Sequence, residues 1–163
     1  MSDQLPVIAI LGGTGDLGTG LARRWAQAGY QVIIGSRTLD KAQAAADDLR
    51  RVMDERGVEA VQVLARDNLA AAEQANIVVL TVPFSHQSST LAAVKPHLEG
   101  KILVDVTVPL VPPKVGTVQL PPEGSAGKRA QDLLGENVQV VTAFQNIAAH
   151  LLQQDVVIEC DVL

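Results

Sequence analysis

The sequence has one cysteine, little charge and no apolar run as long as a membrane span. Cys160 alone excludes a disulfide within the chain, and its apolar neighbours favour a buried side chain over a nucleophile. The net charge of −5 includes no basic stripe, so nucleic acid is not an expected partner. No basic and apolar leader precedes Val7, and a membrane helix needs roughly 20 apolar residues. We therefore expect a cytoplasmic protein that binds neither membranes nor nucleic acid.

An apolar strand pattern at Val7–Leu11 runs directly into a glycine-rich turn. Gly13, Gly15 and Gly18 occupy the three positions of a G-x-G-x-x-G motif. Glycines there allow a tight turn, close approach of the backbone to a pyrophosphate, and close packing of a helix on a strand. The turn is therefore predicted to bind a dinucleotide, with the free N–H groups of residues 14–17 facing the phosphates.

A second strand pattern, Gln31–Gly35, ends about twenty residues beyond the glycines, where a dinucleotide-binding fold reads the adenosine ribose. Sites selective for NAD usually carry Asp or Glu at this point, whereas this chain has Ser36 and Arg37, with Lys41 one helical turn further on. A guanidinium, a hydroxyl and an ammonium suit a 2′-phosphate, so NADP is predicted rather than NAD. The alternative is that Arg37 and Lys41 form only a solvated helix cap.

Strand and helix patterns alternate along the rest of the chain, which predicts a parallel sheet covered on both faces. The expected fold class is α/β, with a Rossmann-type doubly wound, mainly parallel sheet in a single dinucleotide-binding domain over residues 1–163. Further strands are expected at Val61–Leu64, Ile77–Pro83, Ile102–Val106 and Val138–Thr142. Helices are expected at Leu17–Ala28, Ala42–Arg56, Ala70–Gln74, Ser88–Leu98, Lys128–Leu134 and Ile147–Gln153.

Two segments depart from this alternation. Prolines interrupt residues 107–127, so we expect a long loop there, and such loops are often functional. Val156–Leu163 is an apolar run that is expected to form a strand. Because an apolar sheet edge is normally covered or paired, this run indicates a shortened chain, an incomplete gene, or one half of an assembly that a partner completes.

Ligands of an open doubly wound sheet bind beyond the carboxyl ends of its strands. Besides the first two turns, this rule nominates Val82-Pro83-Phe84 and the segments 107–109 and 143–146. Val82 and Pro83 would pack against a ribose, while residues near Val108 and Phe144–Ala149 would lie closest to a nicotinamide. The alternative is that Pro83 and Pro109 only end their strands.

Four segments together resemble the NADPH-dependent coenzyme F420 reductase family: Gly12–Gly18, Gly35-Ser36-Arg37 with Lys41, Leu80–His86, and Ala143–Asn146. The resemblance runs in order over nearly the whole chain. It implies an oxidoreductase that uses NADP and coenzyme F420, holds their rings face to face and transfers a hydride between them. By this match and the strand-end rule, the expected cofactor-binding residues are Gly13, Thr14, Gly15, Asp16, Leu17, Gly18, Ser36, Arg37, Lys41, Val82, Pro83, Phe84, Val108 and Ala149.

The sequence departs from the family pattern in two places. Members carry a further C-terminal helical segment that helps to form the F420 pocket and the dimer interface, and this sequence stops before it. Gln145 stands where some relatives have a histidine, so an imidazole that contacts the ring is not carried over. The resemblance still implies a homodimer or a higher homo-oligomer.

Hydride transfer between two cofactors needs no metal or protein nucleophile, and the sequence has neither a metal-spaced His or Cys cluster nor a Ser, His and acid constellation. His86 is expected either to contact a ligand or to cap a helix, His97 to be exposed, and His150 either to approach the nicotinamide or to be structural. Asp105 either assists proton transfer or hydrogen-bonds at its strand end. Asp16 should turn toward the N–H groups of the helix start, because its carboxylate would repel a pyrophosphate.

Two other functions stay open at this point. One is an NADP-dependent reductase of an imine, a ketone or a metal chelate, which a substrate screen would reveal. The other is a non-catalytic NADP(H)-binding module, which would bind the nucleotide without transferring a hydride.

Overall fold

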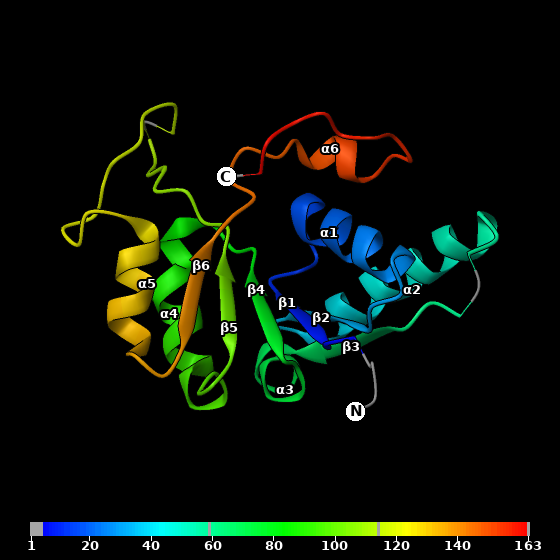
Figure 1. Ribbon diagram of the computed structural model, residues 1–163, viewed down its shortest axis with the longest axis horizontal. Helices are drawn as coiled ribbons and strands as arrows, with labels where there is room; N and C mark the ends of the chain where they lie inside the picture. The colour runs from blue at the N-terminus through cyan, green and yellow to red at the C-terminus, as the bar shows by residue number, and fades with distance from the viewer. Residues whose placement is uncertain (1–4, 59, 114, 163) are drawn as a thin grey trace.

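The computed structural model describes residues 5–58, 60–113 and 115–162, and within these ranges six strands form one parallel sheet (Figure 1). The strand order is β3-β2-β1-β4-β5-β6, and every neighbouring pair runs parallel. The strands are β1 (Ile8–Leu11), β2 (Val32–Ser36), β3 (Val63–Asp67), β4 (Ile77–Leu80), β5 (Ile102–Asp105) and β6 (Gln139–Thr142). This is the strand order of the doubly wound Rossmann sheet, so the expected fold class is confirmed.

Helices lie on both faces of the sheet (Figure 1). One face carries α1 (Asp16–Gln27) and α2 (Leu39–Glu55), and the short helix α6 (Ala149–Leu152) packs against α1. The other face carries α3 (Asn68–Gln74), α4 (Gln87–Val94) and α5 (Ala126–Leu134). Single 3-10 turns, Phe84–His86 and Lys95–His97, precede and follow α4. None of the helices in the described ranges is long and apolar enough to cross a bilayer.

The core consists of two apolar layers, because successive side chains of a strand point to opposite faces. Ile10 and Ile34 pack with the buried residues of α1 and α2, whereas Leu11, Ile33 and Leu80 pack with those of α3, α4 and α5. All five side chains are fully buried. The carboxyl ends of the central strands are thereby held in fixed positions relative to one another.

The element boundaries differ from the expected ones mainly where polar residues join an element. β3 begins two residues after Val61 and continues to Asp67, because it is an edge strand whose Arg66 and Asp67 still pair with the end of β2. α5 begins at Ala126, two residues earlier than expected, because the hydroxyl of Ser125 caps the helix by accepting a hydrogen bond from a backbone N–H.

The prediction of a strand at Val156–Leu163 is wrong. Residues 156–162 run without regular structure, and Leu163 lies outside the described residues. Val157 is 89% exposed. Cys160 is also exposed, which corrects the expectation that it is buried. The run does not continue the sheet because the backbone just before it bonds to side chains of α1.

Two arginines of α1 hold the segment Leu151–Val156, here called the tether segment. The fully buried Arg23 donates hydrogen bonds to the carbonyl oxygens of Leu152 (3.0 Å) and Gln154 (2.9 Å), and it pairs with the carboxylate of Asp155. Arg24 donates to four carbonyl oxygens of the same segment. These bonds hold the backbone against α1 up to Val156, so the run that follows starts from this helix and not from an edge of the sheet.

Candidate functional site

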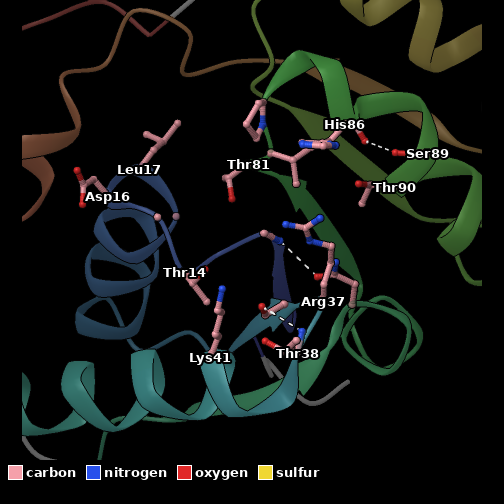
Figure 2. Close-up of a pocket in the computed structure, with 17 residues that line it drawn as sticks. Thr14, Asp16, Leu17, Arg37, Thr38, Lys41, Thr81, His86, Ser89 and Thr90 are labelled. Carbon is pink, nitrogen blue, oxygen red and sulfur yellow. Dashed lines mark hydrogen bonds between the residues drawn. The ribbon is translucent and has the colours of Figure 1, made fainter.

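A cavity of about 720 Å³ opens at the carboxyl ends of β1, β2 and β4 (Figure 2). This volume lies within the usual range of small-molecule sites. The position is the point between β1 and β4 where the strand order reverses, which is where doubly wound sheets bind their ligands. The cavity is therefore the candidate site, and the residues that line it come from four successive strand-to-helix connections.

The glycine turn forms the floor of the cavity. The Gly13 N–H donates a hydrogen bond to the carbonyl oxygen of Gly35 (2.9 Å), which ties the turn to β2. A Cβ atom on Gly18 would lie 2.6 Å from the Cα of Gly13, so the first turn of α1 needs glycine at this contact. A Cβ on Gly15 would meet nothing within 4 Å. The turn is thus compact on its inner side and open toward the cavity.

The amino end of α1 faces the same space. Gly15 is the N-cap of α1 and has no side chain to accept a hydrogen bond from the first turn. Free N–H groups at a helix start, together with the positive end of the helix dipole, form a ready site for an anion. In Figure 2 the labelled side chains of Asp16 and Leu17 lie on this turn, beside Thr14. The turn can therefore hold a phosphate through its backbone.

Two cations lie beside the turn at the end of β2. Arg37 and Lys41 are exposed, and within the described ranges neither side chain donates a hydrogen bond or pairs with a carboxylate. In Figure 2 Arg37 extends in the direction of His86 and Thr90, and Lys41 rises from α2 toward Thr14. Unpaired cations that line a cavity provide a favourable site for an anionic group.

The structure brings most of the predicted site residues together. The cavity is lined by Thr14, Gly15, Asp16, Leu17, Gly18, Ser36, Arg37, Lys41, Val82 and Pro83. Four others do not line it. Gly13 belongs to the turn, but a Cβ atom on it would lie 2.7 Å from the carbonyl oxygen of Ile10, and Phe84 is buried against α5, where the guanidinium of Arg129 lies 5.1 Å from its ring centroid. Val108 and Ala149 follow β5 and β6 outside this cavity, so their contact with a nicotinamide stays a prediction.

Sequence reasoning missed several residues of the cavity wall. These are Gly12, Thr38, Asn68, Thr81, Ser89 and Thr90, while His86 was left with two interpretations. Thr81 and the residues of the α4 start follow β4, so the strand-end rule could have included them. Asn68 escaped because the third strand was expected to end at Leu64, and the rule was not applied to that strand.

Asp105, at the end of β5, belongs to a buried polar cluster whose members do not line the cavity. Its carboxylate accepts hydrogen bonds from the Gln87 amide (2.7 Å) and from the backbone N–H (3.0 Å) and hydroxyl (3.1 Å) of Thr107. The same Gln87 nitrogen donates to the carbonyl oxygen of Ala126 at the start of α5. Burial raises the pKa of Asp105, and these hydrogen bonds partly oppose the rise. Asp105 does not line the cavity, which favours its structural interpretation over proton transfer.

The expectations for the three histidines are met only in part. His86 lines the cavity, and its carbonyl oxygen accepts a hydrogen bond from the Ser89 hydroxyl (3.2 Å). His97 is half-buried, contrary to the expected exposure, and His150 is exposed outside the cavity. Gln145 donates to the carbonyl oxygen of Asp105 (3.0 Å). No group of three or more His, Cys, Asp or Glu residues in the described part of the chain is placed to hold a metal ion.

The sheet order and the glycine turn define a protein with a Rossmann-type nucleotide-binding fold. A family model described as NADP oxidoreductase, coenzyme F420-dependent, matches residues 7–109. The chain belongs to this family, which confirms both the expected resemblance and the expected class of NADP-dependent oxidoreductase.

Named relatives agree with this assignment. The chain is 40% identical over 160 residues to the F420-dependent NADP reductase of Methanocaldococcus jannaschii, a match that covers 96% of this chain and 70% of the relative. It is 43% identical over 162 residues to the enzyme of the same name from Methanothermobacter thermautotrophicus, covering 96% and 68%. The crystal structure of a candidate F420-dependent NADP reductase from Arthrobacter superposes with a TM-score of 0.72 at 28% identity, covering 90% of this chain and 66% of that one.

Proposed function

We propose that the protein transfers a hydride between NADP(H) and coenzyme F420. The observation that carries the proposal is the pair of unpaired cations, Arg37 and Lys41, beside an open glycine turn in a member of this oxidoreductase family. A dinucleotide with a 2′-phosphate has anionic groups for both features, namely the pyrophosphate and the added phosphate. The relatives named as F420-dependent NADP reductases support both cofactors.

The residues of the cavity fit this nucleotide. The open backbone at Gly15 and the free amino end of α1 would hold the pyrophosphate, because no Cβ atom or capping side chain stands between them and the ligand. Arg37 and Lys41 would hold the 2′-phosphate, with the Ser36 hydroxyl as a further partner. Val82 would pack against a ribose. NADP, when bound, supplies the carbon that gives or takes the hydride.

The chain itself would contribute orientation and exclusion of water rather than a reacting group. NADPH, F420 and one proton yield NADP⁺ and reduced F420, so the reaction balances without another reductant. We place the acceptor beyond the ends of β5 and β6, where Val108 and Ala149 lie. The cytoplasmic location and the homo-oligomeric state expected from the sequence also belong to this proposal.

The deciding experiment is a spectroscopic titration with NADPH and NADH, followed by a turnover assay with F420. Selective binding of NADPH together with reduction of F420 is the expected result. Binding of NADPH without reduction of F420 would favour a reductase of another small substrate, or a non-catalytic NADP(H)-binding module. Absence of NADPH binding would contradict the assignment of the cavity.

A further inference from the structure

Asn68 connects the third strand-to-helix unit to the glycine turn. It is the first residue of α3, yet its Oδ1 accepts a hydrogen bond from the N–H of Gly12 at 3.3 Å. The side chain reaches the turn across Gly35, where a Cβ atom would lie 2.9 Å from the same Oδ1. The absence of a side chain at Gly35 therefore creates the passage that Asn68 occupies.

This bond fixes the orientation of the Asn68 amide. Because Oδ1 faces a donor, Nδ2 must form the other end of the amide group. Within the described ranges no acceptor bonds to Nδ2, and Asn68 lines the cavity as a half-buried residue. Its two N–H donors are therefore available to a ligand.

The neighbourhood of Asn68 indicates which part of a ligand these donors would meet. The Oδ1 of Asn68 lies 2.9 Å from the place that a Cβ atom of residue 35 would take. Gly35 is followed directly by Ser36 and Arg37, the predicted partners of the 2′-phosphate. An amide N–H is a good donor to a phosphate oxygen, and it adds direction to the less directional attraction of nearby cations.

We propose that Asn68 is a specificity-determining residue whose Oδ1 positions the glycine turn and whose Nδ2 donates a hydrogen bond to the 2′-phosphate of NADP. This inference rests on the proposed function, because it requires NADP in the cavity. It adds a neutral donor from β3 and α3 to a site otherwise assigned to the connections after β1, β2 and β4.

The test uses the variant Asn68→Asp, which keeps an acceptor for the Gly12 N–H, removes the donors and adds a negative charge. Fluorescence titrations with NADPH and NADH measure the effect, because the two probes differ only in the 2′-phosphate. We expect Asn68→Asp to weaken NADPH binding at least tenfold and NADH binding less than threefold. Asn68→Ala, which removes both functions, should weaken both nucleotides and still reduce the preference for NADPH.

Asn76 provides a matched control. Its Oδ1 also accepts a backbone N–H, from Val7 at 2.8 Å, but it lies before β4 at the opposite end of the sheet. Asn76→Asp makes the same chemical change and should leave the ratio of NADPH to NADH affinity unchanged.

The remaining outcomes of these titrations distinguish the inference from the proposed function. Unchanged NADPH binding by Asn68→Asp would show that Asn68 only braces the turn, and an equal loss for both nucleotides would place its donors away from the 2′-phosphate. Either result overturns the inference and leaves the proposed function intact. If Asn68→Asp does not fold, the nucleotide preference of Asn68→Ala decides the question in the same way. Failure of the unmodified protein to bind NADPH would instead overturn the proposed function, and the inference with it.

Discussion

The two halves of the sheet differ in how their faces are covered. Every residue of β1 and β2 is buried, because α1 and α2 lie on one face and α3 on the other. In β6, by contrast, only the face toward α5 is packed, and the described part of the chain places no helix over Gln139 and Val141. Val141 is 47% exposed.

We call β1 and β2 the covered half of the sheet and β6 its half-covered side. The two parts would serve different tasks. The fully covered half fixes the glycine turn and the end of β2, so the backbone groups proposed to bind the pyrophosphate are held in place before any ligand arrives. The half-covered side leads into the proline-rich segment 107–125 and into α6, where we place the acceptor. If this comparison is correct, substitutions in the covered half should have larger effects than matched substitutions in the other half.

A methyl group at two glycines offers the largest expected contrast. Gly18→Ala would place a Cβ atom 2.6 Å from a backbone atom of the turn, so we expect a loss of about 3 kcal/mol in the free energy of unfolding. Gly116→Ala, in the proline-rich segment, meets nothing within 4 Å and should change stability by less than about 0.5 kcal/mol. Urea denaturation of both variants measures the change in the free energy of unfolding. Equal changes would contradict the proposed difference between the two parts of the sheet.

A charge reversal at Arg37 tests the site itself. Arg37→Asp should weaken NADPH binding about 100-fold, which is about 2.7 kcal/mol, because charge-assisted hydrogen bonds are lost and repulsion is added. NADH binding should change little. Lys128→Asp, the same reversal on α5 outside the cavity, should affect neither nucleotide. Titration of both variants provides the measurement, and an equal loss of NADPH and NADH would contradict the 2′-phosphate assignment.

Truncation of two arginines compares buried and exposed attachments. Arg23→Ala removes a buried guanidinium, its two hydrogen bonds to the tether segment and its ion pair with Asp155, while Arg24 still donates to both carbonyl oxygens, so we expect a loss of about 2 kcal/mol of stability. Arg51→Ala removes exposed ion pairs to Asp48 and Glu55 on α2 and should cost less than about 0.5 kcal/mol. Thermal or urea unfolding distinguishes the two. A small effect at Arg23 would show that the tether segment contributes little to the covered half.

The smallest expected effect depends on pH and concerns Asp105, where β5 meets the half-covered side. Its raised pKa means that the folded state binds the proton more tightly than the unfolded chain does. Its contribution to stability should therefore decrease as pH rises from about 4, the ordinary carboxyl pKa, through the higher pKa of the folded state. The stability difference between the unmodified protein and Asp105→Asn, followed by urea denaturation across pH, should show this slope. A difference that does not vary with pH would contradict it.

Sequence patterns predicted the covered half well for a physical reason. Strands buried on both faces are almost continuously apolar, and a glycine turn has few alternatives once a strand and a helix flank it. The same reasoning predicted Ser36, Arg37 and Lys41 at the cavity, since residues just beyond a strand lie at its carboxyl end. The family assignment, which the comparisons confirm, also depended on these segments.

The prediction was weaker where tertiary partners decide the structure. The apolar run after Val156 resembles a strand, but the sequence gives no sign that Arg23 and Arg24 take the carbonyl groups just before it. Asn68 was missed for a related reason, because its importance depends on a passage across Gly35 that links units more than thirty residues apart. Cys160 was expected in a core because its neighbours are apolar, yet no strand forms there to bury it.

The exposure of Cys160 has a practical consequence for studying motion. It is the only thiol in the sequence, so a maleimide dye would attach at one known position without any engineering. The attachment point lies four residues beyond the tether segment, which is bonded to the helix whose amino end borders the cavity. A fluorophore there would report, in real time, whether filling the cavity alters the environment of the far end of the chain.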